Sequence, residues 1–346
     1  MSLKNLNVKS KTHKYLLNSL RDQRVFQIYK KFERNFKCNQ DFIVAVSGGP
    51  DSLALTFLTK IYSIKKSLKV KYFIIDHKLR KNSSSEAQSV KNLLKEKSIN
   101  VSIIKWNGIK PKSNVQSLAR KKRYNILEDQ ADKLNIKNIL TGHHWEDLYE
   151  NFFIRISRGS GLNGLVSFGE TINKGKIKII RPLLNFEKKD LIYLTNNFFK
   201  QYIIDPSNED DKFKRSRIRK LTKSLQAEGL DKKKFFLTIK NLKNSNETIN
   251  FYVKQNLKDN LFFNKKKNIA FLKIEFFKQP HEVIFRSFSE IIKSVGKNYY
   301  PSRGKKIDRI IEIIKNFPNS TVKLTLGNCL INKVNQSIIV TKEQKI

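Results

Sequence analysis

The chain has 346 residues and carries 70 Lys and Arg side chains against 30 Asp and Glu, a formal net charge of +40. That length allows about two domains with separate cores, and the charge disfavours basic partners and favours polyanions such as nucleic acids. The two cysteines, Cys38 and Cys329, are too few for a disulfide framework, a zinc knuckle or an iron–sulfur cluster, so we expect none of these.

The composition also bears on the source of the charge and on the cellular compartment. The chain is rich in Lys, Asn and Ile, as AT-rich coding would produce, although coding bias alone should not suppress carboxylates so strongly. Met1 to Leu20 is polar and basic, and no apolar stretch approaches the roughly 18 residues of a membrane span. We therefore expect a soluble, cytoplasmic protein without a membrane partner, whose two thiols stay reduced.

Short β-rich runs alternate with longer helical patterns over the first two thirds of the chain. The predicted strands are Phe42–Val46, Val70–Ile75, Val101–Trp106, Asn138–Thr141 and Ile177–Ile180. The predicted helices are Ser52–Lys65, Ser84–Lys97, Asn114–Leu134, His144–Ile156 and about Glu187–Phe198. Strands joined by crossover helices predict an α/β fold with a doubly wound parallel sheet, in which ligands bind at the carboxyl ends of the strands.

The pattern changes at residues 226–234, where Gly229 and a cluster of lysines interrupt it. We place a linker there, between an N-terminal domain of residues 1–225 and a smaller, mainly helical C-terminal domain of residues 235–346. Its predicted helices are Phe235–Asn260, Glu282–Ser294 and Lys305–Asn316, and its predicted strands are Asn268–Ile274, Val322–Leu326, Leu330–Val334 and Ile338–Val340. The smaller domain therefore ends in short strands.

A glycine-rich turn follows the first predicted strand directly, and it reads Ser47-Gly48-Gly49-Pro50-Asp51-Ser52. Adjacent glycines let the backbone approach an anion, serine hydroxyls add donors, and the N–H groups that open the next helix point at the phosphate. Asp51 adds a carboxylate suited to Mg2+. No Gly-Lys-Ser or Gly-Lys-Thr occurs in the chain, which argues against a Walker-type site. The same residue types also occur in ordinary strand-to-helix turns.

Polar side chains follow the second predicted strand and cover a later predicted helix. Asp76 and His77 should emerge at the same edge of the sheet as the glycine-rich turn, where a base or ribose could bind. Arg120 and Arg123, beside Tyr124, give one helix a positive face suited to phosphate or carboxylate groups. Each signal is weak alone, because Asp often caps a helix and basic helix faces are often simply solvated.

The fourth predicted strand ends in Thr141-Gly142-His143-His144, and the helix that follows carries Asp147 and Glu150. Residues three apart share a helix face, so the two carboxylates should converge on one ligand with a histidine above them. A second metal-ligand pair of defined spacing is missing, so a cationic substrate fits better than a metal. Arg155 and Arg158 then begin a basic stretch suited to a phosphate backbone.

Taken together, these motifs resemble those of the bacterial tRNA(Ile)-lysidine synthetase family, in the ATP-pyrophosphatase (PP-loop) superfamily. The matching blocks run in family order across residues 42 to about 220, and similarity beyond them is thinner, apart from Thr325–Cys329. The blocks are Ser47–Ser52, Asp76-His77 with Leu79-Arg80, Asn114 with Ala119-Arg120 and Arg123-Tyr124, His143-His144 with Asp147 and Glu150, Arg158–Leu162 with Gly164-Leu165, Arg181–Leu184, and Asp205–Asn208 with Arg215, Arg217 and Arg219.

The resemblance implies a two-step modification of the wobble cytidine in tRNA(Ile) with the anticodon CAU. ATP adenylates the C2 oxygen, and the ε-amine of free L-lysine displaces AMP to leave lysidine, so that AMP and pyrophosphate are released. Adenylation makes chemical sense, because a pyrimidine carbonyl is a poor electrophile with a poor leaving group. The lysine amine, with a pKa of about 10.4 in water, must also lose a proton before it attacks.

The resemblance also assigns roles to residues. Asp51, Asp147 and Glu150 are the expected catalytic residues, with Asp51 as the Mg2+ ligand and the other two binding the lysine amine. The expected ATP contacts are Ser47, Gly48, Gly49, Pro50, Asp51, Ser52, Asp76 and His77. The expected tRNA or phosphate contacts are Arg80, Arg120, Arg123, Arg155, Arg158, Arg215 and Arg219. We expect the N-terminal domain to carry the chemistry and the C-terminal domain to bind tRNA.

The sequence departs from the family pattern at two places, and two other functions are also compatible with parts of it. Lys78 stands where many relatives have glycine, and Leu148-Tyr149 replaces a small polar pair, so the pocket shapes are in doubt. A PP-loop tRNA thiolase also binds ATP and tRNA, but it needs cysteines that Cys38 and Cys329 do not supply. A non-catalytic basic RNA-binding protein explains the charge but not the motifs. The sequence leaves a homodimer open.

Overall fold

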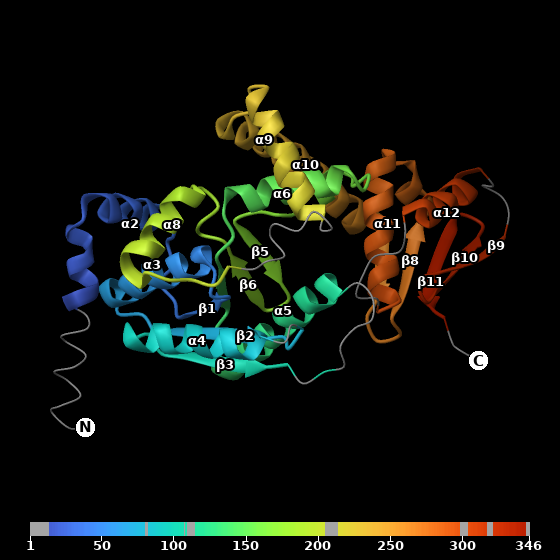
Figure 1. Ribbon diagram of the computed structural model, residues 1–346. Helices are drawn as coiled ribbons and strands as arrows, with labels where there is room; N and C mark the ends of the chain where they lie inside the picture. The colour runs from blue at the N-terminus through green and yellow to red at the C-terminus, as the bar shows by residue number, and fades with distance from the viewer. Residues whose placement is uncertain are drawn as a thin grey trace. The chain divides into compact units, whose positions relative to one another are not determined.

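The computed structural model describes residues 14–79, 82–106, 108, 115–204, 214–297, 304–316 and 321–343 (Figure 1). The chain divides into two compact units, Met1–Asp231 and Lys232–Ile346. The division falls between two helices, α9 (Lys214–Ala227) and α10 (Lys232–Asn260). None of the helices in the described part of the chain is long and apolar enough to cross a membrane.

A six-stranded sheet organises the first unit, with the strand order β3-β2-β1-β4-β6-β5. The strands are β1 (Phe42–Val46), β2 (Val70–Asp76), β3 (Val101–Lys105), β4 (Asn138–Thr141), β5 (Thr171–Lys174) and β6 (Ile177–Ile180). All neighbours pair in parallel except β5, which forms an antiparallel hairpin with β6. The doubly wound, mostly parallel sheet expected from the sequence is confirmed, and the antiparallel edge strand is the one addition.

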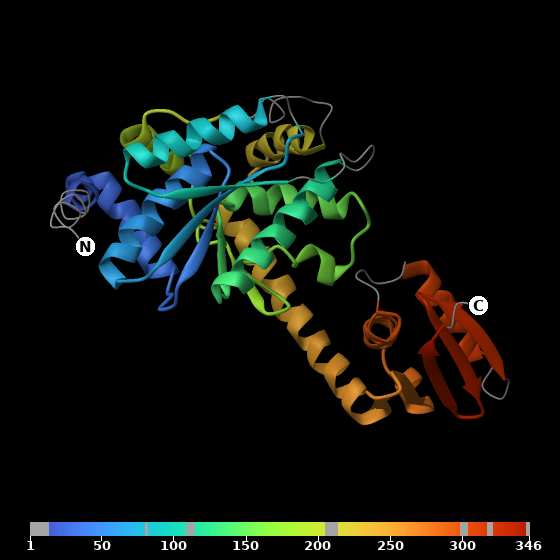
Figure 2. The same cartoon turned by 90° about the horizontal axis from the view of Figure 1, so that it is seen from below.

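Helices cover both faces of this sheet because β1 is apolar on both sides (Figures 1 and 2). Phe42, Val44 and Val46 point into one core, whereas Ile43 points into the other. The helices are α2 (Gln23–Asn35), α3 (Pro50–Lys66), α4 (Ser83–Glu96) and α8 (Lys188–Phe199) in the first core, and α5 (Val115–Leu134) in the second. The central strand β1 therefore reads as a continuous apolar run.

The topology places a switch point between β1 and β4. The chain leaves β1 through α3 toward β2 on one side, while β4 pairs with the other side of β1. Connections that depart in opposite directions open a crevice at the carboxyl ends of the two strands, where open α/β sheets bind ligands. The glycine-rich turn after β1 and the histidine-containing turn after β4 both lie at this edge.

Further helical segments in the described part of the first unit include η1 (Ser19–Arg21), α6 (Trp145–Ile156) and α7 (Leu162–Leu165), and α9 packs against α6. Neither α2 nor α9 was predicted. In α9 the buried side chains that the structure describes include Ser216 and Thr222 beside Ile218, whereas Leu221 is exposed, so the buried face is only partly apolar.

The second unit combines helices with a five-stranded antiparallel sheet in the order β7-β8-β11-β10-β9. Its elements after α10 are β7 (Leu261–Asn264), β8 (Ile269–Lys273), η3 (Ile274–Lys278), α11 (His281–Val295), α12 (Gly304–Asn316), β9 (Val322–Leu326), β10 (Cys329–Val334) and β11 (Ser337–Lys342). Its core is separate from those of the first unit and includes Phe276, Phe288 and Ile311. The predicted combination of helices and terminal strands is confirmed, but β7 was not predicted because it follows α10 without a break.

Candidate active site

The turn after β1 has a shape that requires glycine at position 48. Gly48 has a φ of +84°, a left-handed conformation that L side chains rarely adopt. A Cβ there would lie 2.5 Å from Cγ2 of Val90 in α4. The Gly48 carbonyl accepts a 2.9 Å hydrogen bond from the Ile203 amide, beyond α8. The turn is therefore held closely between two other segments.

Ser52 ties the turn into a closed loop. The Ser47 amide and hydroxyl both donate to Oγ of Ser52, at 3.2 and 3.1 Å, and this hydroxyl donates to the Gly49 carbonyl at 2.9 Å. Gly49 is the N-cap of α3, and Pro50 occupies its first turn. The N–H groups of a first helical turn have no acceptor within the helix, so they favour an anion.

The turn after β4 approaches the same helix end. A Cβ on Gly142 would lie 3.0 Å from backbone atoms of Asp51 and Ser52, so this position has no room for a larger side chain. His144 follows as the N-cap of α6, and its amide donates to Oδ2 of Asp147 at 2.9 Å. The close approach of the two turns brings the histidine to the glycine-rich turn Ser47–Ser52, which we call the phosphate loop.

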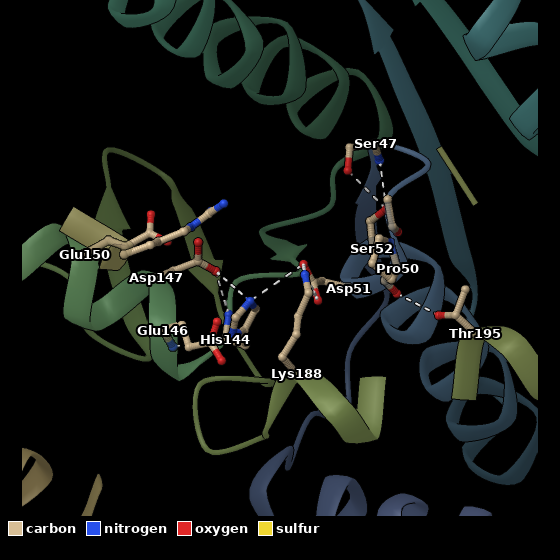
Figure 3. A network of polar contacts seen from close by, with 12 residues as sticks. Ser47, Pro50, Asp51, Ser52, His144, Glu146, Asp147, Glu150, Lys188 and Thr195 are labelled. Carbon is tan, nitrogen blue, oxygen red and sulfur yellow. Dashed lines mark hydrogen bonds and ion pairs between the residues drawn. The ribbon is translucent and has the colours of Figure 1, made fainter. Parts of the chain in front are cut away.

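Asp51 lies at the centre of a charged network (Figure 3). Nζ of Lys188, the first residue of α8, contacts both carboxylate oxygens of Asp51, Oδ1 at 2.9 Å and Oδ2 at 2.7 Å. Nε2 of His144 lies 3.7 Å from Oδ2 of Asp51 and 3.8 Å from Oδ2 of Asp147. Nδ1 of His144 accepts from the Glu146 amide at 3.4 Å, which leaves Nε2 facing the two carboxylates.

Asp147 and Glu150 both lie on α6, as predicted, but their surroundings differ. The Asp147 side chain is 24% exposed and faces His144. The Glu150 side chain is only 5% exposed and forms an ion pair with Arg219 of α9. Burial would lower the pKa of Arg219, but the ion pair with Glu150 outweighs burial and leaves that pKa raised. A cationic ligand would therefore meet Asp147 directly and Glu150 only alongside or in place of Arg219.

Asp76, at the end of β2, accepts hydrogen bonds from the first turn of α4 and from the loop before it. The Ser83 and Ser84 hydroxyls donate to it at 2.8 and 2.6 Å, and the Lys78 amide donates at 3.0 Å. Burial opposes ionisation of Asp76, but these hydrogen bonds outweigh it and lower its pKa. Lys78 has a φ of +51°, which gives a backbone reason why glycine suits this position. The contacts of Asp76 are those of a residue that anchors a helix start.

Two neutral histidines lie at this edge of the sheet. Burial, reinforced by the positive charge of Arg123, lowers the pKa of His77 to about 4, and its Nε2 accepts from Nε of Arg123 at 3.2 Å. Burial also lowers the pKa of His143 to about 3. The charge of Asp147 opposes this shift, and the charges of nearby arginines add to it. Its Nδ1 lies 2.8 Å from Oγ1 of Thr141. Both rings are therefore uncharged near neutral pH.

The predicted arginine contacts lie around this histidine pair and along α6. Arg120 lies over the ring of Tyr124, 5.4 Å from its centroid, while Arg155 donates to Oδ1 of Asn151 at 2.8 Å. Burial, with the charges of Arg158 and Arg120, lowers the pKa of Arg155. Arg80, Asn114, Asp205–Asn208 and the side chain of Arg215 lie outside the described part of the chain.

Several residues of the site were missed or given no role in the sequence. Arg181, after β6, is 3% exposed, donates to the Gly169 carbonyl at 2.7 Å and stacks on Phe168 at 4.1 Å. Lys188 and Thr195 of α8 contact the phosphate loop, the latter through a 2.8 Å hydrogen bond to the Pro50 carbonyl. No local signal separates Lys188 from the rest of the 70 lysines and arginines in the chain.

The PP-loop domain family matches residues 19–225. The tRNA(Ile)-lysidine synthase of Orientia tsutsugamushi (strain Boryong) is 32% identical over 321 residues, which cover 89% of this chain and 71% of that protein. The chain belongs to the tRNA(Ile)-lysidine synthase family. A second member, from Rickettsia felis (strain ATCC VR-1525 / URRWXCal2), is 31% identical over 335 residues, 91% of this chain and 74% of that protein. As a member of this family, the chain is a ligase of tRNA modification that uses ATP.

A solved structure supports the fold. The U34-tRNA thiolase NcsA from Methanococcus maripaludis, with its [4Fe-4S] cluster, matches with a TM-score of 0.56 and 15% identity, over 65% of this chain and 79% of that one. At this identity the likeness shows a shared fold and nothing more. It does not extend the thiolase's chemistry to this chain.

Proposed function

We propose that the chain joins free L-lysine to C2 of the wobble cytidine of tRNA(Ile) with the anticodon CAU. ATP would adenylate the C2 oxygen first, and the lysine amine would then displace AMP, with pyrophosphate released in the first step. The observation that carries the proposal is the position of His144, within 4 Å of both the phosphate-loop carboxylate Asp51 and the amine-binding candidate Asp147. This arrangement supports activation and attack at one edge of the sheet.

At the phosphate end, Ser47, Gly48, Gly49 and Ser52 would hold the pyrophosphate part of ATP. Both oxygens of Asp51 converge on one cation, the Lys188 ammonium, so the carboxylate is oriented to bind a positive charge. Mg2+ is usually bound by one or two carboxylates together with substrate phosphates, so Asp51 fits it. When bound, Mg2+ would neutralise charge on the phosphates.

At the amine end, Asp147 and Glu150 would bind the side-chain ammonium of lysine. Asp147 is the more accessible carboxylate, and Glu150 would share its charge between lysine and Arg219. The ammonium has to lose a proton before it attacks, and a carboxylate beside it is a suitable acceptor. The neutral His143 would orient groups here without adding positive charge that repels the amine, and Nε2 of His144 faces both Asp51 and Asp147.

The tRNA would be bound by basic side chains of both units. Arg120, Arg123, Arg155 and Arg158 lie on α5, on α6 and just after it, and we propose that they contact phosphates of the anticodon region. We assign catalysis to residues 1–225 and added tRNA affinity to residues 235–346. A truncated chain that ends near Gln226 should then bind tRNA more weakly and with a smaller salt dependence, because each phosphate neutralised contributes about 0.7 to 0.9 to the slope of log affinity against log salt.

The direct test uses ATP, Mg2+, radiolabelled lysine and an unmodified tRNA(Ile) transcript with the anticodon CAU. We expect label in this RNA and none in a methionine tRNA that shares the anticodon. An Asp147→Asn variant should bind ATP normally but incorporate much less label. Label in neither RNA, from folded protein that binds ATP, would contradict the choice of lysine as the nucleophile.

Two alternatives predict different outcomes. A thiolase requires reactive cysteines, but both thiols are buried: Sγ of Cys38 donates to the Gln40 carbonyl and Sγ of Cys329 to the Ile292 carbonyl, each at 3.3 Å. Burial raises the pKa of Cys329 to about 11, so its nucleophilic thiolate is scarce. Lysine incorporation should survive replacement of both cysteines by serine. A non-catalytic RNA-binding protein would release no pyrophosphate when ATP and tRNA are added.

The proposal also includes a cytoplasmic location for the protein. The sequence leaves a homodimer open, and sedimentation would test it.

A further inference from the structure

Lys188 is the most closely engaged cation of the phosphate end, and nothing so far gives it a role. Its Nζ contacts both carboxylate oxygens of Asp51, and its side chain is 34% exposed. We propose that Lys188 is the phosphate-binding lysine of this site. It neutralises Asp51 in the nucleotide-free protein and binds terminal phosphate oxygens when ATP is present. The inference rests on the proposed use of ATP and adds a residue to it.

The position of Lys188 is fixed by the packing of its helix. The apolar side of α8 is buried through Leu191, Leu194 and Phe198, and the Phe198 ring lies 4.6 Å from that of Phe57 in α3. Thr195 is seven residues after Lys188, two helical turns along, and so shares its face. Its hydroxyl donates to the Pro50 carbonyl at 2.8 Å. The helix is therefore attached to the phosphate loop at two points on one face.

A comparison with the next residue shows that this contact is specific. Lys189 is 73% exposed and pairs with Glu187, at the start of the same helix. An exposed pair of this kind contributes little to stability or to a site. Lys188, one residue earlier, faces the loop that the sequence identifies as the phosphate cradle. The two lysines form a matched pair in which only the first has the proposed role.

The chemistry of the site explains why a lysine is needed. Phosphate loops of the Walker type carry their own lysine, which reaches the terminal phosphates, whereas no Gly-Lys-Ser or Gly-Lys-Thr occurs here. An ammonium on a flexible four-carbon stem is a mobile point charge, so it can move from a carboxylate to a phosphate while its Cα stays in place. Lys188 thus supplies from α8 the charge that the loop lacks.

The same geometry makes Lys188 a competitor for any cation that binds Asp51. Its ammonium uses both carboxylate oxygens, so a metal ion has to displace it in the absence of nucleotide. Removing the lysine charge should therefore weaken phosphate binding and strengthen metal binding. A lysine that only stabilises the loop would weaken both, and a lysine without a role would change neither.

The test measures the two affinities separately in the full-length chain. Calorimetry gives the affinity for pyrophosphate in EDTA and for ATP with Mg2+, and electron paramagnetic resonance gives the affinity for Mn2+ without nucleotide. For Lys188→Met we expect pyrophosphate affinity to fall about tenfold, as for loss of one charged hydrogen bond. Mn2+ affinity should rise severalfold. Lys188→Arg should keep most of the pyrophosphate affinity, and Lys189→Met should match the wild type in both.

The outcomes separate this inference from the proposed function. If the wild-type chain binds neither pyrophosphate nor ATP, the proposed function fails. If the wild type binds and folded Lys188→Met binds equally well, only the role of Lys188 is overturned. A fall in the affinities for both pyrophosphate and Mn2+ would show instead that Lys188 only stabilises the loop. Lys188→Gln serves as a second neutral variant, and failure of both neutral variants to fold would show the same.

Discussion

The two ends of the candidate site are built in different ways. At the phosphate end, the hydrogen bonds that close the loop on itself join Ser47, Gly49 and Ser52, although Ile203 and Thr195 also bond to it from beyond and from within α8. At the amine end, Asp147 and Glu150 share a helix, but the partner of Glu150 comes from α9, 69 residues along the chain. A locally closed loop can be recognised from its residues, whereas the amine end depends on how two helices pack.

The two ends nevertheless share one property. Each contains a carboxylate that we expect to bind a cation, and each carboxylate is already paired with a cation of the chain: Asp51 with Lys188 and Glu150 with Arg219. Substrate cations would have to compete with these internal partners. The following changes should show whether the two pairs have separate roles.

The largest effect is expected at the phosphate end, from Asp51→Asn. This change removes the carboxylate that fits Mg2+, and such metal stabilisation of a transition state is worth several kcal/mol. Pyrophosphate release that depends on tRNA should fall at least about 100-fold, measured by single-turnover kinetics with unchanged thermal stability. Asp190→Asn is the control, since the Asp190 side chain pairs with Arg24 at 3.1 Å. Equal rates for the two variants would contradict the assignment.

The amine end should respond mainly in stability. Arg219→Met leaves the Glu150 carboxylate, 5% exposed, without this partner. We expect a loss of about 2 to 3 kcal/mol in the free energy of unfolding, measured with urea, because breaking a buried ion pair by removing one of its members is costly. The double variant with Glu150→Gln should recover most of the loss. If Arg219→Met is as stable as the wild type, the ion pair is not holding α9 against α6.

Gly48→Ala tests the shape of the phosphate loop. The methyl group would meet Val90 at 2.5 Å and force a side chain into a φ of +84°. We expect pyrophosphate affinity to fall about tenfold, since left-handed strain alone costs about 1 to 2 kcal/mol and the contact adds to it. Gly175→Ala is a matched control, because its φ is +59° and nothing lies within 4 Å of the added atom. It should lose stability but keep its pyrophosphate affinity.

The neutral histidine at the amine end should make stability depend on pH. His143 has a folded pKa of about 3 against 6.5 for the unfolded group, so the unfolded chain binds more protons between these values. The stabilisation is present above pH 6.5 and is lost as the pH falls, by at most about 1.4 kcal/mol per pH unit. His143→Asn should flatten this dependence in urea titrations between neutral and mildly acid pH. An unchanged slope would show that other groups cause the dependence.

The smallest effect is expected from a single exposed arginine after α6. Arg158→Ala should reduce the slope of log tRNA affinity against log salt by about 0.7 to 0.9, the contribution of one phosphate. ATP affinity should be unchanged, because no contact of Arg158 with the phosphate loop is expected. Filter binding over a range of salt concentrations gives the slope. An identical slope would remove Arg158 from the tRNA interface.

Most of the first unit's architecture followed from the sequence because its signals are local. The apolar runs of β1, β4 and β6 have the predicted bounds, and the crossover helices between the parallel strands lie close to their predicted positions. The short edge strand β5 was missed because it holds one apolar residue, and α9 was missed because its few apolar residues lie among many basic ones. In the second unit, β7 was missed because it continues directly from α10.

The sequence by itself determined the phosphate loop, the doubly wound sheet and the family, because each depends on contiguous residues or on apolar runs. Only the tertiary structure decided which cations meet the carboxylates. Lys188 reaches Asp51 across 137 residues and Arg219 reaches Glu150 across 69, through the packing of α8 on α3 and of α9 on α6. In a chain with 70 basic side chains, a residue's type says nothing about such a contact, because only the folded backbone brings those two side chains to the site.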